Sequence, residues 1–217
     1  MQSADTRVEG EIVILVHGLY LHGLAMVPLQ RRLNACGFRC RRFSYPSLRD
    51  SVANNATRLS QYLRAIDTPI VHFVCHSLGG LLVRAMLLQS SWRRPGRVLT
   101  LGTPHLGSYV ATRLDARPEL AWILGESFRH GLDGDLPAWP MEREVGTISG
   151  SRAIGAGRVV PGLPKPNDGT VAVAETELGP EYPRVVLAET HSSLLISRRA
   201  AAYACAYLHT GRFPEVP

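Results

Sequence analysis

The amino-acid sequence predicts an α/β fold, a single doubly wound, mostly parallel sheet of about six strands with helices on both faces. Six short runs rich in β-branched residues each stop at Gly, Pro, Ser or His. They cover residues 11–18, 38–46, 69–77, 97–104, 144–151 and 184–191. Helical periodicity occupies residues at about 24–35, 51–66, 78–89, within 109–128 and 192–208. Because tight hairpins cannot join parallel strands, this alternation indicates crossover helices over both faces of the sheet.

Length and composition favour one globular domain over residues 1–217. The chain has 45% hydrophobic and 19% charged residues, a balance typical of a folded protein with a single core. Its net charge is +6, but the arginines are scattered and no aromatic residues are interleaved with them. Such scattering indicates solvated faces, so no nucleic-acid partner is expected.

The apolar runs also bear on location. The longest of them have the length of strands and fall well short of the roughly 20 residues that cross a bilayer. Residues 1–11 lack the hydrophobic core of a signal peptide. The sequence therefore predicts a cytoplasmic protein without a transmembrane segment, and it leaves peripheral membrane contact and the oligomeric state open.

The four cysteines are interpreted as reduced structural thiols. Cys36, Cys40, Cys75 and Cys205 have no CxxC spacing and no histidines clustered with them. The alternative is a disulfide, Cys36–Cys40 or another pairing, in a form that has lost a leader. No metal or organic cofactor is expected.

Ser77 lies where the third strand-like run turns into a helical pattern, in the stretch Cys-His-Ser-Leu-Gly at 75–79. A sharp strand-to-helix turn projects its central residue beyond the edge of the sheet, and it places the N–H of Leu78 at a helix N-terminus, where it can stabilise negative charge. Cys75 stands where the G-x-S-x-G pattern has its first glycine. The alternative interpretation is that Ser77 caps a structural helix.

The end of the first strand offers a second donor. In His17-Gly18-Leu19 the glycine lets the loop bend toward a nucleophile. The N–H of Leu19 can then complete an oxyanion hole with that of Leu78, and the Leu19 side chain can contact an apolar substrate.

Five stretches, LVHGLY, CHSLGG, LGTPHLGS, NDGTV and THSSLL, occur in this order and resemble the α/β-hydrolase superfamily. The resemblance is narrower to the small bacterial lipases and esterases, and it covers roughly residues 11–211. It implies the chain order Ser, acid, His, and therefore a triad of Ser77, Asp168 and His191. In such a triad His191 moves the proton and Asp168 orients its ring.

Other residues could fill these roles. The rival acids are Asp115, Asp133, Asp135 and Glu175. The rival histidines are His105 and His209, for which packing or a favourable helix-dipole contact is the simpler interpretation.

The resemblance implies a serine hydrolase that cleaves small-molecule or lipid esters with an apolar acyl group through an acyl-serine intermediate. An acyltransferase or thioesterase would use the same triad, and a non-catalytic binding protein could share the scaffold. An apolar excursion at about 109–141 either packs as core or caps the site. If it caps the site, Trp122, Phe128 and Trp139 would join Leu19 in substrate binding.

Overall fold

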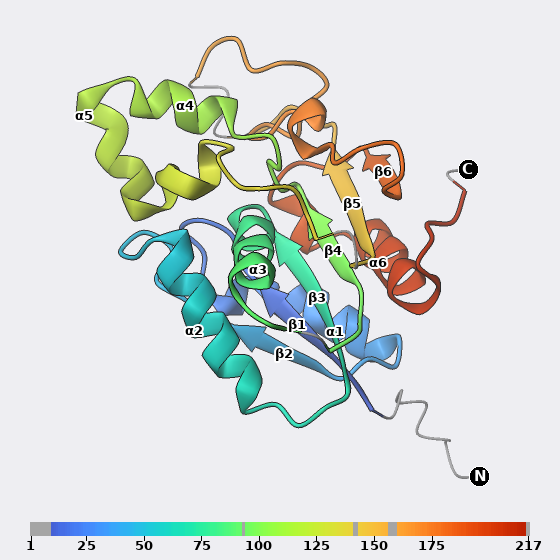
Figure 1. Ribbon diagram of the computed structural model, residues 1–217. Helices are drawn as coiled ribbons and strands as arrows, with labels where there is room; N and C mark the ends of the chain where they lie inside the picture. The colour runs from blue at the N-terminus through green and yellow to red at the C-terminus, as the bar shows by residue number, and fades with distance from the viewer. Residues whose placement is uncertain (1–9, 93, 141–142, 156–159, 216–217) are drawn as a thin grey trace.

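Six parallel strands form the sheet of the computed structural model, which describes residues 10–92, 94–140, 143–155 and 160–215. The strand order is β2-β1-β3-β4-β5-β6, and every neighbouring pair is parallel (Figure 1). The strands are β1 (Glu11–Val16), β2 (Cys40–Phe43), β3 (Ile70–His76), β4 (Val98–Leu101), β5 (Val145–Gly150) and β6 (Arg184–Leu187). The predicted fold class is confirmed.

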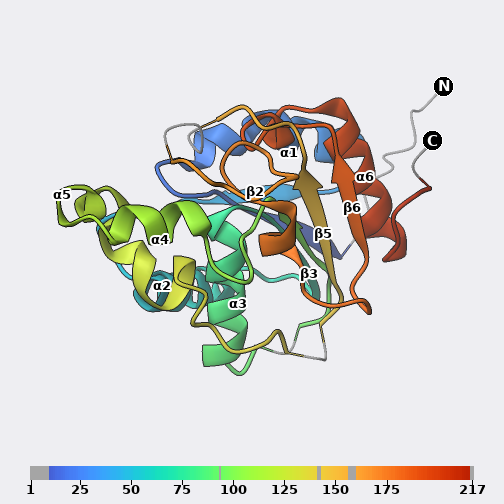
Figure 2. The ribbon, with the colours of Figure 1, turned by 90° about the horizontal axis from the view of Figure 1, so that it is seen from above.

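Helices cover both faces of the sheet, because successive residues of β3 are buried on opposite faces. Val71, Phe73 and Cys75 are buried against the face of α2 (Val52–Arg64) and α3 (Leu78–Gln89). Val74, between them, belongs to the opposite core, which packs against α1 (Val27–Ala35) and α6 (Arg198–Thr210). Figure 2 shows these two helix pairs on opposite sides of the strands. Successive residues of a strand point to opposite faces, so one strand serves both cores.

The last helical segment is interrupted. Residues 192–208 were expected to form one helix, but a 3-10 turn (Ser193–Leu195) comes first and α6 starts at Arg198. Ser197 caps α6 by accepting a hydrogen bond from the N–H of Ala200 at 3.1 Å. The hydroxyls of Ser193 and Ser197 both donate to Glu189, at 2.6 and 2.5 Å. These side-chain bonds compete with a continuous helix. A second 3-10 turn (Gly23–Met26) precedes α1 in the same way.

A disulfide joins Cys36 to Cys205, with their Cα atoms 6.2 Å apart. The interpretation of these two residues as reduced thiols is wrong, as is the alternative Cys36–Cys40 pairing. The cause is the packing of α1 on α6, which brings together residues separated by 169 positions. Cys40 and Cys75 are free and buried, and burial raises the pKa of the Cys40 thiol to about 12.

The apolar excursion between β4 and β5 contains four short helical segments. They are α4 (Tyr109–Asp115), α5 (Pro118–Ala121), a 3-10 segment (Trp122–Ser127) and a π-type turn (Phe128–Leu132). Its predicted last residue, 141, lies outside the described residues. Figure 1 shows α4 and α5 beyond the arrowheads of β3 and β4, at the carboxyl edge of the sheet. We call residues 109–140 the cap.

Buried Arg84 of α3 holds the end of the cap. Its guanidinium donates to the backbone carbonyls of Pro137 at 2.7 Å, Leu136 at 2.8 Å and His105 at 3.1 Å. Three main-chain acceptors thus satisfy this buried cation and tie the returning chain to the helix that follows Ser77.

No helix among the described residues is long and apolar enough to cross a bilayer.

Candidate active site

Ser77 occupies a strained turn between β3 and α3. Its φ of 52° and ψ of −125° lie in a region that non-glycine residues rarely adopt. The turn is braced on both sides: the N–H of Ser77 donates to Leu101 at 2.9 Å, and the hydroxyl of Thr103 donates to the Ser77 carbonyl at 2.8 Å. The Ser77 side chain makes no capping hydrogen bond to α3. A structural helix cap therefore does not explain its position.

Small residues let the first strand and the turn come together. A Cβ on Gly79 would lie 2.5 Å from the carbonyl oxygen of Val16 at the end of β1. A Cβ on Gly18 would lie 2.9 Å from the Cβ of Ser77. Any larger residue at these positions would push the loop after β1 away from Ser77.

The loop after β1 is held by a buried histidine. Nδ1 of His17 lies 2.9 Å from the carbonyl oxygen of Gly18, and its Nε2 accepts from the N–H of Tyr45 at 3.2 Å. These partners place the proton on Nδ1, because a carbonyl can only accept. The carbonyl of Gly18 and the N–H of Leu19 belong to one planar peptide group and point in opposite directions. His17 therefore fixes the direction of the Leu19 N–H as well.

Asp168 and His191 are in direct contact although 23 residues separate them. Oδ2 of Asp168 lies 2.7 Å from Nδ1 of His191, and the N–H of His191 donates to the Asp168 carbonyl at 2.9 Å. Oδ1 accepts from the N–H groups of Thr170 and Val171, at 2.9 and 2.7 Å. Asp168 is 1% exposed, and these bonds hold its carboxylate in one orientation.

Gly102, which follows β4, packs directly against the Asp168–His191 pair. A Cβ on Gly102 would lie 3.0 Å from both Asp168 Oδ2 and His191 Nδ1, and its φ is 58°. Only glycine fits there without moving the pair.

Ser77, His191 and Leu19 all line one pocket of about 350 Å³ beneath the cap. Most of its wall is apolar, and six cap residues contribute to it: Val110, Ala111, Leu114, Ile123, Leu124 and Leu132. An apolar pocket with a few converging polar groups is the usual form of a site for a small apolar ligand.

The three aromatic residues predicted to bind substrate are not among those that line the pocket. Trp122 is 77% exposed, and Phe128 packs against the core on the α2 and α3 side. Trp139 is buried and donates from Nε1 to Nδ1 of His105 at 3.4 Å. Other cap residues, Ile123, Leu124 and Leu132 among them, line the pocket instead.

The rival residues have other partners. Glu175 accepts hydrogen bonds from the N–H groups of Tyr109 and Ala172. His105 is buried beside Thr100, 3.1 Å from its hydroxyl. The remaining rivals lie in exposed loops or at a helix end, and none of them is hydrogen-bonded to His191 or Ser77: Asp115, Asp133, Asp135 and His209.

The sequence pattern did not indicate that His76 contacts His191. Its Nε2 lies 2.9 Å from the carbonyl oxygen of His191, and the two rings are 4.6 Å apart. Burial lowers the pKa of His76 to about 3, so the ring is neutral near pH 7. The dipeptide His-Ser gives no sign of this contact, because the partner comes from a loop 115 residues away.

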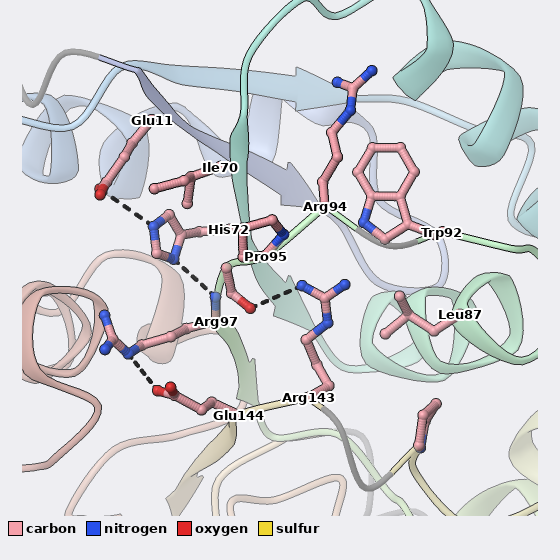
Figure 3. Close-up of a pocket in the computed structure, with 12 residues that line it drawn as sticks. Glu11, Ile70, His72, Leu87, Trp92, Arg94, Pro95, Arg97, Arg143 and Glu144 are labelled. Atoms are coloured by element: carbon pink, nitrogen blue, oxygen red, sulfur yellow. Dashed lines mark hydrogen bonds and ion pairs between the residues drawn. The ribbon is translucent and has the colours of Figure 1, made fainter.

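A larger cavity, of about 500 Å³, lies at the opposite edge of the sheet (Figure 3). Its charged groups have partners: Arg97 pairs with Glu144 at 2.6 Å, and His72 lies 3.3 Å from Glu11. Arg94 and Arg143 donate to backbone carbonyls. The residues described in its lining include no serine, threonine or cysteine. Size alone would favour this cavity, but of the two it is the smaller pocket whose described lining brings a serine and a histidine together.

Known proteins are similar to this chain in sequence and in fold. The sequence matches the family described as "Alpha/beta hydrolase family" over residues 13–212. No curated protein matches it. Among solved structures, the Bacillus licheniformis lipase BlEst2 in mature form is 19% identical over 94% of this chain and 93% of its own, with a TM-score of 0.71.

Two further structures show the range of similar proteins. The metagenomic carboxyl esterase MGS0156 is 15% identical over 93% of this chain and 76% of its own, with a TM-score of 0.70. The NocB thioesterase domain from the nocardicin cluster is 18% identical over 92% of this chain and 94% of its own, with a TM-score of 0.61. At such identities the likeness shows the fold.

Proposed function

Since the chain belongs to the alpha/beta hydrolase family, we propose that it is a serine hydrolase that cleaves carboxylic esters with an apolar acyl group. The observation that carries the proposal is the Asp168–His191 bond of 2.7 Å at the wall of an apolar pocket that also contains Ser77. A bacterial lipase and a metagenomic carboxyl esterase among the similar structures support the same substrate class.

In the proposed reaction, His191 takes the proton from the Ser77 hydroxyl while Oγ attacks the ester carbonyl carbon. The N–H groups of Leu19 and Leu78 stabilise the oxyanion that forms. The tetrahedral intermediate collapses when the carbon–oxygen bond to the alcohol breaks, and His191 returns the proton to that leaving group. Water then attacks the acyl-serine with the same proton transfers, and this step releases the acid and restores Ser77.

Asp168 serves this cycle in two ways. Its contact with Nδ1 keeps the proton there, so Nε2 of neutral His191 is available as the base. Its charge stabilises the imidazolium that appears in each half-reaction. Because backbone N–H groups hold the other carboxylate oxygen, Asp168 keeps its orientation through the cycle.

A thioesterase is the second candidate, favoured by the similarity to the NocB thioesterase domain. It would use the same groups, so the leaving group decides between the two functions. Parallel rates with an oxygen ester and a thioester of the same acyl chain separate them.

The test is covalent labelling of purified protein with an organophosphonate, followed by intact-mass analysis. Wild type should gain one adduct and should hydrolyse p-nitrophenyl esters, with longer acyl chains preferred to acetate. Ser77→Ala should lose both properties. Ser108→Ala is the matched control, because Ser108 lines the same pocket while its hydroxyl caps α4. Equal labelling of wild type and Ser77→Ala would refute the proposal.

A further inference from the structure

His76 precedes Ser77 in the chain, yet its side chain contacts the backbone of His191, the proposed base. The residue is 3% exposed. It ends β3 on the face that carries α1 and α6, the face from which the loop of His191 approaches. Its Nε2 meets the backbone carbonyl of His191 at 2.9 Å, and the two rings are tilted by 50°.

The direction of this hydrogen bond follows from its acceptor. A carbonyl oxygen cannot donate, so Nε2 of His76 carries the proton. Nδ1 then presents a lone pair, and it is buried without a hydrogen-bond partner among the described residues. Leaving a buried acceptor unpaired costs free energy. An apolar side chain would fill the same space without that cost, so the Nε2–H bond is the property that requires histidine.

The peptide groups of His191 are thereby held from both sides. Asp168 accepts from its N–H at 2.9 Å, and His76 donates to its carbonyl. Asp168 also holds Nδ1 of the ring. Because His76 is covalently bonded to Ser77, its contact links the position of the base directly to that of the nucleophile.

We propose that His76 is a positioning residue, which fixes the backbone of His191 relative to Ser77 so that the imidazole meets the Ser77 hydroxyl in the reactive geometry. This inference rests on the proposed function. Misplacing a catalytic group by about 1 Å can cost on the order of 100-fold in rate. His76 also lines the pocket, but its hydrogen bond goes to the backbone of the proposed base, so we expect the loss in kcat more than in KM.

The test compares His76→Phe, which keeps a ring without a donor, with His76→Gln, which restores an N–H at similar reach. We expect kcat for a p-nitrophenyl ester to fall roughly 10- to 100-fold in His76→Phe, with KM changed less than about threefold. Phosphonate labelling of Ser77 should slow in parallel. His76→Gln should recover most of kcat.

His72 supplies the matched control. It is another buried histidine of β3, and Figure 3 shows it among the residues that line the larger cavity, hydrogen-bonded to Glu11 and to the backbone N–H of Arg97. His72→Phe should lower the melting temperature while leaving kcat within about threefold of wild type. This variant separates a positioning effect from a general loss of stability.

Each outcome decides the matter. Unchanged kcat in His76→Phe, no recovery in His76→Gln, or an equal loss in His72→Phe would overturn the inference and leave the proposed function intact. If His76→Phe does not fold, His76→Leu replaces it under the same criteria. A wild-type protein that neither hydrolyses esters nor reacts with the phosphonate would overturn the proposed function, and this inference with it.

Discussion

A single methyl group at Gly18 should disable the proposed oxyanion hole. The added Cβ would lie 2.9 Å from the Cβ of Ser77, about half an ångström closer than ordinary contact allows. The loop after β1 must move by at least that amount, which stretches a hydrogen bond from Leu19 to the oxyanion beyond its useful length. Losing one such donor costs about 3–4 kcal/mol of transition-state stabilisation, so Gly18→Ala should lower kcat roughly 100- to 1,000-fold.

The assay is p-nitrophenyl ester hydrolysis, with the melting temperature measured on the same samples. Gly146→Ala is the control, because its Cβ would meet the ring of Tyr207 at 2.6 Å in the core, where it overpacks β5 without touching the pocket. Both variants should lose about 1–3 kcal/mol of stability, but only Gly18→Ala should lose kcat. Retention of kcat within threefold in Gly18→Ala would refute the reasoning, as would an equal loss in the control.

Three further predictions concern the acid, a buried histidine and the disulfide. Asp168→Asn should lower kcat about 1,000- to 10,000-fold by favouring the wrong tautomer of His191, with an unchanged circular dichroism spectrum; normal turnover would exclude this acid. Burial lowers the pKa of His105 to about 3, so the unfolded chain binds a proton that the folded chain does not as the pH falls from about 6.5 toward 3. Stability should therefore decrease with falling pH in this window by about 1.4 kcal/mol per unit from this residue, and His105→Gln should remove that slope in urea titrations. Reduction of Cys36–Cys205, which closes 169 positions, should cost about 2–5 kcal/mol in the same titrations; an unchanged midpoint with and without reductant would contradict it.

The strands were predictable because their signals are local, and the same signals indicated where Ser77 and His191 lie relative to the sheet. A buried strand needs a short β-branched run, and Ser77 and His191 each follow such a run where the carboxyl edge of the sheet must lie. The start of α6 was misplaced by six residues, because serine hydroxyls that bind Glu189 interrupt a pattern that remains apolar and periodic.

Contacts between segments that lie far apart along the chain could not be predicted from the sequence. Nothing near Cys36 indicates Cys205, and nothing near His76 indicates the carbonyl that it binds. Hydrophobicity alone also cannot separate a buried tryptophan from an exposed one in a segment of short helices. Trp139 is buried by its contact with His105, while Trp122, in the same cap, faces solvent.

The way in which Arg84 anchors the cap has a consequence for how the protein could diversify. All three acceptors of its guanidinium are main-chain carbonyls, which every amino acid supplies. Substitutions in the returning segment therefore leave the attachment in place. Lysine at position 84 would offer its three N–H groups from a single nitrogen, whereas the three carbonyls now bind three different guanidinium nitrogens. Libraries that vary Ile123, Leu124 and Leu132 can thus change the lining of the pocket without altering the contacts that attach the cap.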